Sequence, residues 1–365
     1  MATVVSENAP LLRAAPTVAA RRNRAVAVAV LAWLAAVPLL ILLPLLFSSP
    51  APPPPPQPVS LVAIGDWGRD AQHGQKQVAS ALASVISTHL NHSAVSIIST
   101  GDNFYKSGVS STRDGKFNSS FEAVYHHPLL QTVPWYVALG NHDHLGDIHA
   151  QVAYSKQSKR WNMPLPYFSK RLSPHLMALF LDTTPFVDGA YGKQARIVNR
   201  QSPHAQLAWL RKLLRSLDAR TYILVVGHHN MYSMSMDDHL GTPSVRDALE
   251  PILKPYSDRL LAYVSGHEHS LMHMQPTVSP HVVDHFLSGA GSKLHRIVEP
   301  RAEEREKWYK CCDVLPVLAQ PSAPRTVWGR STNGFFVFDF DGRRFTAKAV
   351  DADANVIYSY SKTMR

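Results

Sequence analysis

The sequence has almost no cysteine. Its two cysteines, Cys311 and Cys312, are adjacent in a chain of 365 residues. Neighbouring cysteines can bridge only with severe strain, so the composition excludes a disulfide framework and leaves free thiols or a bridge to another molecule open. The folded part must therefore be stabilised by packing, and the chain is long enough to bury an ample core.

Charge is missing from a long segment near the N-terminus. Residues 25–47 contain no Asp, Glu, Lys or Arg, four arginines come before them, and the next charged residue is Asp66. A helix of that length spans about 35 Å, which is enough to cross a bilayer. The positive-inside rule then predicts a short cytosolic basic tail at residues 1–24, a transmembrane signal anchor at 25–47, and the remainder on the other side of the membrane.

A cleaved signal peptide is the competing interpretation of this segment. Its apolar core would be shorter, about 7–15 residues, so the length favours an uncleaved anchor. We therefore expect a single-pass type II membrane protein with its domain at the cell surface or in a secretory or lysosome-like lumen, and a secreted form if cleavage occurs. Residues 48–58 contain seven prolines, typical of a polyproline II spacer before a domain at 59–365. Sequons at Asn91 and Asn118 fit this orientation.

Acidic residues are fewer than basic ones, and the net charge is +10. Removing residues 1–24, with four arginines and one glutamate, leaves +7. The basic residues are scattered, without an aromatic-interleaved stripe or a nucleic-acid motif. This pattern argues against nucleic acid as a partner and favours a modest attraction to anionic substrates or surfaces. Nothing in the sequence predicts an oligomeric state.

Apolar, β-branched runs alternate with helical patterns along the chain, which indicates an α/β fold. Strands are predicted at 59–64, 95–99, 134–139, 176–181, 222–226 and 260–264, and helices at 75–90, 121–127 and 203–217. Further strand-like segments at 282–287, 335–340, 345–350 and 355–360 would complete the sheets. Residues 293–325, rich in charge and proline, are predicted to be a long surface loop.

Five of the predicted strands end in a glycine followed directly by a potential metal ligand. These ligands are Asp66, Asp102, Asn141, His228 and His267. A single Gly–Asp or Gly–His is typical of an ordinary turn. Because α/β sheets keep their chemistry at the carboxyl ends of the strands, five such pairs in one chain instead indicate a shared site.

The residue types divide into two ligand sets. Asp102 and Tyr105 are three residues apart across one turn, close enough to bind the same ion. Asp66, Tyr105 and one histidine suit a hard trivalent ion, whereas Asn141 and two further histidines suit a divalent ion. Two ions about 3.5–4 Å apart need a shared carboxylate, and Asp102 is the natural bridge.

The five segments read GDWG, GDNFY, GNHD, VVGH and GHEH, and longer runs at 140–162, 204–210 and 287–291 accompany them. With these segments the sequence resembles the purple acid phosphatases of the calcineurin-like metallophosphoesterase superfamily, in particular the short tartrate-resistant animal type. The similarity runs from about Val59 to Leu294. It implies a four-layer α-β-β-α sandwich of two packed mixed sheets. The chain departs from the animal type in lacking its cysteine pair.

The resemblance also implies a role for each residue. Fe(III) would be bound by Asp66, Asp102, Tyr105 and His269, and a divalent Fe, Zn or Mn by Asp102, Asn141, His228 and His267. His142 matches the phosphate-contacting histidine of the family. His239 is the candidate for a second one, although it lies further from His228 than in the animal type. His144 and His229 are expected beside the site, not as ligands.

The implied activity is an acid phosphatase that hydrolyses phosphate monoesters of small molecules or phosphoproteins. Hydroxide held by the two metal ions would be the nucleophile. His142 and His239 would be cationic at acidic pH, stabilise the phosphoryl oxygens and protonate the leaving group. The alternatives are a phosphodiesterase or pyrophosphatase on the same fold, and a non-catalytic binding protein tethered to a membrane. The physiological substrate is not predicted by the sequence.

Overall fold

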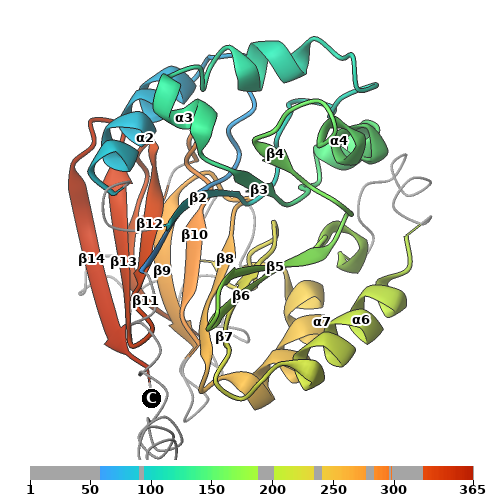
Figure 1. Cartoon of the computed structure of the whole chain (residues 1–365), viewed down its shortest axis with the longest axis vertical. Helices are drawn as coiled ribbons and strands as arrows, with labels where there is room; N and C mark the ends of the chain where they lie inside the picture. The colour runs from blue at the N-terminus through green and yellow to red at the C-terminus, as the bar shows by residue number, and fades with distance from the viewer. Residues whose placement is uncertain are drawn as a thin grey trace, which may run out of the picture. The chain divides into compact units, whose positions relative to one another are not determined.

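Two seven-stranded sheets organise the part of the chain that the computed structural model describes, which comprises residues 58–89, 94–187, 201–233, 241–276, 283–295, 297 and 324–364. The first sheet has the strand order β14-β13-β12-β1-β2-β3-β4 and the second β11-β9-β10-β8-β7-β6-β5 (Figure 1). The first contains β1 (Val59–Ile64), β2 (Ala94–Ser99), β3 (Trp135–Val137), β4 (Trp161–Asn162), β12 (Gly334–Phe340), β13 (Arg344–Asp351) and β14 (Val356–Thr363). The second contains β5 (Phe168–Ser173), β6 (Leu176–Phe180), β7 (Tyr222–Val226), β8 (Leu260–Ser265), β9 (Leu271–Pro276), β10 (His285–Ser288) and β11 (Pro324–Arg330).

Each sheet mixes parallel and antiparallel pairs. Strands β1 to β4 are parallel neighbours, as are β6, β7, β8 and β10, while the remaining pairs are antiparallel. The predicted pair of mixed sheets is confirmed. Parallel strands end at the same edge of a sheet, so the segments that follow β1, β2 and β3 emerge together, and those that follow β7 and β8 do likewise.

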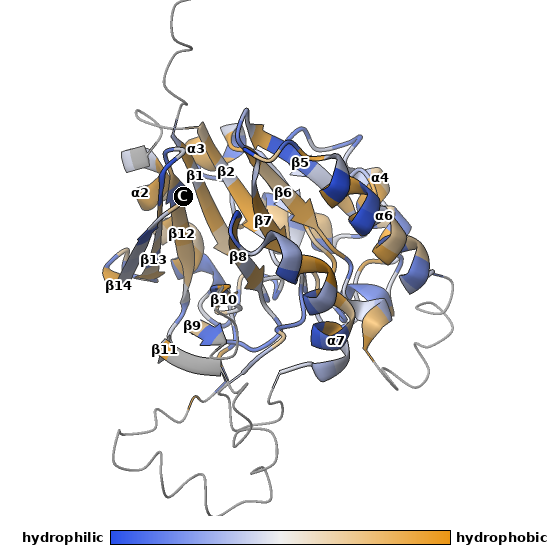
Figure 2. Ribbon diagram, turned by 90° about the horizontal axis from the view of Figure 1, so that it is seen from below, coloured by the Kyte–Doolittle hydropathy of each residue, from blue (hydrophilic) through white to orange (hydrophobic). Residues whose placement is uncertain are grey.

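The inner faces of the two sheets pack against each other through aromatic rings. Phe286 on β10 lies 5.2 Å, between ring centroids, from both Phe336 and Phe338 on β12. Strand β7 shows why the strands are continuously apolar. Leu224 and Val226 belong to the core between the sheets, whereas the alternate residues pack toward the helices. A strand buried on both faces has no polar side, and Figure 2 shows β6 to β8 as largely hydrophobic.

Helices cover the outer faces of the sheets. Helices α2 (Gln75–His89) and α3 (Pro128–Thr132) lie beside the first sheet, and α6 (Pro203–Ser216) and α7 (Pro243–Leu253) pack on the second (Figure 1). Leu210 of α6 and Leu249 of α7 share a core with Ile223 of β7. A shorter helix, α4 (Ile148–Tyr154), follows β3. Ser202 caps α6 by accepting a hydrogen bond from the Ala205 N–H, as its position before Pro203 predicts.

One predicted helix is wrong, and one observed helix was not predicted. The helix expected at 121–127 is replaced by a π-helix at Phe117–Glu122, and α3 begins only at Pro128, where proline fits the first turn and the His127 side chain caps it. Helix α7 was not predicted, although Thr242 and a proline at its first position precede an apolar repeat. Of the loop predicted at 293–325, the last two residues belong instead to β11, which begins at Pro324.

Several predictions concern residues outside the described ranges. They include the basic tail, the anchor at 25–47, almost all of the spacer, and Asn91, His239, Cys311 and Cys312. Among the described helices, none has the length and apolar character that a membrane span requires.

Candidate metal centre

The predicted ligands come from five segments that leave the sheets at adjoining edges. Asp66 follows β1, Asp102 and Tyr105 follow β2, Asn141 follows β3, His228 follows β7, and His267 and His269 follow β8. The two sheets meet at this edge. The His267 N–H donates to Asp66 Oδ2 at 2.9 Å, and the Gly266 N–H donates to the His228 carbonyl at 2.9 Å. The fold thus brings all seven side chains into one cluster.

Glycine precedes the ligands because a side chain would not fit there. A Cβ on Gly101, whose φ is +104°, would lie 2.7 Å from His228 Nδ1, and one on Gly266 would lie 2.5 Å from Asp66 Oδ2. Three ligand residues are themselves in the left-handed region, Asp66, Asp102 and His267, with φ of 59°, 53° and 75°. Such strain persists only where the surrounding structure imposes it, and it concentrates at functional sites.

One ligand set forms a triangle of two oxygens and a nitrogen. Tyr105 Oη lies 3.0 Å from Asp66 Oδ1 and 3.0 Å from His269 Nε2, and the remaining side, between His269 Nε2 and Asp66 Oδ1, is 3.5 Å. All three residues are buried. This is the hard-oxygen set that the sequence predicts for a trivalent ion.

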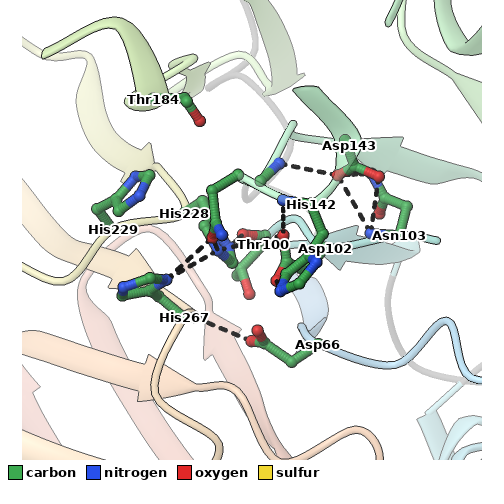
Figure 3. Close-up of polar contacts among 12 residues, drawn as sticks. Asp66, Thr100, Asp102, Asn103, His142, Asp143, Thr184, His228, His229 and His267 are labelled. Atoms are coloured by element: carbon green, nitrogen blue, oxygen red, sulfur yellow. Dashed lines mark hydrogen bonds and ion pairs between the residues drawn. The ribbon is translucent and has the colours of Figure 1, made fainter. Parts of the chain in front are cut away.

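The second set forms a similar triangle. Asn141 Oδ1 lies 2.9 Å from His228 Nε2 and 3.1 Å from His267 Nδ1, and these two ring nitrogens are 3.3 Å apart. His228 Nδ1 is 3.0 Å from the Thr100 carbonyl and donates its hydrogen there, which leaves Nε2 with a lone pair that faces the site. Figure 3 shows the His267 ring turned toward His228.

Asp102 lies between the two sets. Its Oδ1 is 3.4 Å from His228 Nε2 and accepts the His142 N–H at 2.9 Å, as Figure 3 shows. On the other side, Asp102 is close enough to Tyr105 for its charge, after burial, to be the largest influence that raises the pKa of that phenol. The carboxylate predicted as the bridge is thus next to both triangles.

The donor atoms fit metal ions in spacing and in type. With bonds of about 2.1 Å, neighbouring ligands are about 3.0 Å apart in an octahedral arrangement and about 3.4 Å apart in a tetrahedral one. The sides of both triangles, 2.9 to 3.5 Å, lie close to these values. In each triple Asp66, Asp102, His228 and His228, His229, His267, one ligand atom from each residue lies within 4.8 Å of the others.

The site favours positive charge. Burial alone would lower the pKa of His228, but Asp102 and Asp66 outweigh that effect and raise it. Burial likewise would raise the pKa of Asp66, yet hydrogen bonding and charge from His269, His228 and His267 lower it below its usual range. A cation placed among these groups would satisfy the same electrostatic demand without protonating a ligand.

His142 lies at the rim of the cluster and is 32% exposed. Its ring centroid is 4.5 Å from that of Tyr105, its Nδ1 contacts the Lys106 carbonyl, and its Nε2 is 3.9 Å from Asp102 Oδ2. A Nδ1–H donated to that carbonyl leaves Nε2 directed at the site. The second predicted histidine, His239, is outside the described residues.

A buried chain of hydrogen bonds, which the sequence analysis did not identify, joins three ligand-bearing segments. Trp67 donates through Nε1 to Ser99 Oγ at 2.9 Å, and Ser99 donates to Asn103 Oδ1 at 2.6 Å. Asn103 Nδ2 donates to Asp143 Oδ2 at 3.1 Å, and that same oxygen accepts the Gly140 N–H at 2.8 Å. Burial and the nearby Asp102 raise the pKa of Asp143 to about 6. In the sequence, the only indication of this chain is that Trp67, Asn103 and Asp143 lie one or two residues from the predicted ligands Asp66, Asp102 and Asn141.

Glu268 links the two segments of the second sheet. It lies between His267 and His269, is buried, and accepts hydrogen bonds from Asn230 Nδ2 at 2.9 Å and from Ser233 Oγ. Burial raises its pKa to about 7. His229, expected beside the site, is 2.8 Å through Nδ1 from Thr183 Oγ1, and His144 is 2.9 Å through Nε2 from Asp182 Oδ2. Both rings therefore bond to groups outside the two triangles.

Comparison with known proteins identifies the relatives of this chain. The model of the calcineurin-like phosphoesterase family matches residues 59–271. The tartrate-resistant acid phosphatase type 5 of Sus scrofa is 38% identical over 243 residues, which cover 63% of this chain and 69% of that protein. Purple acid phosphatase 17 of Arabidopsis thaliana is 32% identical over 311 residues, covering 82% of this chain and 80% of that protein.

Among solved structures, GAP50, described as the anchor in the inner membrane complex of Plasmodium, superposes with a TM-score of 0.62. It is 21% identical, and the match covers 84% of this chain and 89% of that chain. At this level of identity the likeness extends to the fold only.

Proposed function

We propose that this chain is an acid phosphatase that hydrolyses phosphate monoesters at a binuclear metal centre. The chain belongs to the calcineurin-like phosphoesterase family and is similar to its purple acid phosphatases. One observation carries the proposal. Two triangles of donor atoms, with sides of 2.9 to 3.5 Å, lie on either side of a single carboxylate. A protein that only used this fold as a scaffold would have no need to preserve both.

The ligands divide between two ions. Asp66, Tyr105 and His269 would bind Fe(III), Asn141, His228 and His267 would bind a divalent Fe, Zn or Mn, and Asp102 would bind both. When bound, the metal pair supplies Lewis acidity toward phosphoryl oxygens and acidifies water. The phenol of Tyr105, a donor that prefers trivalent iron, distinguishes this set from a site of carboxylates and histidines alone.

The protein's own groups provide the remaining chemistry. Because His142 Nε2 faces the site while Nδ1 is engaged with the Lys106 carbonyl, the ring can hold a phosphoryl oxygen or give a proton to the leaving oxygen without rotating. The His142 N–H orients the Asp102 carboxylate. His239 remains a predicted partner for His142. Phosphorylated small molecules and phosphoproteins are both candidate substrates, and nucleic acid is not.

The test combines metal analysis, a visible spectrum and substrate comparison on the purified protein. We expect iron and a second metal, a visible charge-transfer band, and faster hydrolysis of p-nitrophenyl phosphate than of its bis-ester. Tyr105→Phe should remove the band while the fold persists. His228→Asn should lower activity by about 100-fold or more with loss of the divalent ion. His175→Asn, a histidine at the amino end of β6, should change neither.

Two results would contradict the proposal. A metal-free protein without monoesterase activity would favour a binding role, and a preference for the bis-ester would favour a phosphodiesterase.

The proposal extends to a membrane. Residues 25–47 would anchor the protein with residues 1–24 in the cytosol and the phosphatase domain on the opposite side. The uncharged segment and the arginines before it support this, and so does the exposure of Asn118, the sequon residue within the described part. Alkaline extraction should leave the chain in the membrane pellet, and Asn118→Gln should remove a glycosidase-sensitive mass. Release into the supernatant would indicate cleavage or a soluble protein.

A further inference from the structure

Arg69 lies against the predicted iron ligand Tyr105. Its guanidinium carbon is 3.4 Å from the centroid of the phenol ring, the distance of direct stacking. Within the described residues, no ion pair involves this guanidinium, and its Nε is buried without a hydrogen-bond partner. A half-buried arginine whose main contact is the face of a ring is held there by a cation–π interaction.

The backbone fixes this stack. The Tyr105 N–H donates to the Gly68 carbonyl at 2.9 Å, and a Cβ on Gly68 would lie 1.8 Å from the Asn103 carbonyl oxygen. The two segments therefore touch through their main chains. The Arg69 N–H is held in turn by Gln75 Oε1 at 3.3 Å, where α2 begins. These bonds fix the main chain from which the Arg69 side chain reaches the Tyr105 ring.

Negative charge surrounds the oxygen of Tyr105, and the stacked Arg69 guanidinium would offset it. Its Oη is 3.0 Å from Asp66 Oδ1, and Asp102 is nearby, so a phenolate at this position would be the third anionic donor in a buried cluster. A cation over the ring attracts the negative charge that a phenolate spreads into its π-system. It does so from the side of the ring, leaving the oxygen free to coordinate.

We propose that Arg69 is a positioning residue of the metal centre, which fixes the Tyr105 ring and weakens the electron donation of its phenolate toward the ferric ion. The proposal rests on the proposed function, because it concerns the iron set of the same site. Arg69 stabilises the filled orbitals of the phenolate, so charge transfer from phenolate to iron requires more energy when the guanidinium is present. Removing it should shift the visible band to longer wavelength.

The experiment compares three variants of the iron-loaded protein. Arg69→Met keeps an unbranched side chain over the ring without charge, and Arg69→Lys keeps a charge without the planar stack. We expect a shift on the order of 10 nm to longer wavelength for Arg69→Met and a smaller one for Arg69→Lys. The matched control is Arg259→Met. The Arg259 guanidinium carbon lies 5.1 Å from the centroid of another tyrosine ring, that of Tyr256, just before β8. The visible band of this variant should stay at the wild-type wavelength.

The other outcomes overturn the proposal in distinguishable ways. If Arg69 instead contacts substrate, Arg69→Met will raise KM about tenfold or more while the resting band stays within the error of the wild-type position. If Arg69 only stabilises the fold, the melting temperature will fall and the band will not move. Should the wild-type protein bind iron without any visible band, the phenolate assignment fails, and with it both the proposed iron site and the role of Arg69.

Discussion

Asp284 should carry a large share of the stability that the protein retains in acid. It immediately precedes β10, is 1% exposed, and accepts hydrogen bonds from His273 Nε2 at 2.8 Å and Lys362 Nζ at 2.6 Å. His273 belongs to β9 of the second sheet and Lys362 to β14 of the first. This single carboxylate therefore connects the two sheets at the amino end of β10. We predict that Asp284→Asn destabilises the fold without altering the visible band.

The magnitude follows from the ionisation of this group. Burial alone would raise the pKa of Asp284, but His273 and Lys362 lower it to about 2 from 3.8. Each tenfold change in an ionisation constant is about 1.4 kcal/mol, so the ionised carboxylate contributes about 2.5 kcal/mol. Leaving Lys362, whose side chain is 20% exposed, beside a neutral amide adds to the loss, and breaking a buried ion pair typically costs about 3–5 kcal/mol.

The sign of the pH dependence is fixed by the direction of the shift. Because the folded-state pKa is lowered, the contribution is complete above about pH 5 and is lost as the pH falls through 3.8 toward 2. Urea unfolding of wild type and Asp284→Asn should differ by about 3 kcal/mol or more at pH 5 to 7, and the difference should narrow by about 1 kcal/mol at pH 3. An acid phosphatase would thus keep this contribution at its working pH.

A matched surface carboxylate supplies the control. Asp247 is 69% exposed and pairs with Arg246 at 3.1 Å, so Asp247→Asn should cost less than about 1 kcal/mol at every pH. Equal losses of stability in the two variants, or a loss in Asp284→Asn that does not depend on pH between 7 and 3, would refute this role of Asp284.

Two further predictions concern the support of the metal centre. Gly101→Ala should lower metal content and activity at least about tenfold, because its Cβ would lie 2.7 Å from His228 Nδ1 at a φ of +104°. The control is Gly115→Ala, whose Cβ would meet nothing within 4 Å, and it should leave metal content and activity unchanged. Equal activity in the two variants would contradict this. Asn103→Ala should lower the free energy of unfolding by about 2–3 kcal/mol and weaken metal retention, since it removes the Nδ2 donor to buried Asp143 and the Oδ1 acceptor of Ser99. Retained metal with normal activity would show that the ligand segments hold their positions without this side chain.

Much of the cluster could be predicted because its requirements are local. A ligand at the end of a buried strand, beside a strand from another part of the chain, leaves no room for a Cβ on the preceding residue. Gly101 and Gly266 meet this constraint directly, against His228 and Asp66 respectively. At these two positions the glycine reflects the close approach of the two sheets, whereas a Cβ on Gly140 or Gly227 would meet a residue of the same sheet. In both cases the glycine can be recognised in the sequence without knowing how the strands pair.

The contacts that depend on distant surroundings could not be predicted in the same way. Arg69 is an ordinary charged residue in the sequence, and only the approach of the segment after β2 places it on Tyr105. Glu268 looks like a spacer between two histidines until Asn230 is found donating to it. The helix expected at 121–127 was wrong because Pro128 sets the start of α3, which outweighs the helical spacing before it.

The strained backbones of the predicted ligands need support from the surrounding protein. Residues at positive φ, such as Asp66 and Asp102, cost about 1–3 kcal/mol each and need support from their surroundings. Trp67, the residue after Asp66, provides part of that support. Trp67 packs with Phe104, Tyr125 and other aromatic rings at centroid distances of 5.6 to 6.4 Å, and its indole begins the hydrogen-bonded chain to Asn103. The segment that carries Asp66 is therefore held against the segment that carries Asp102 by contacts of the protein itself.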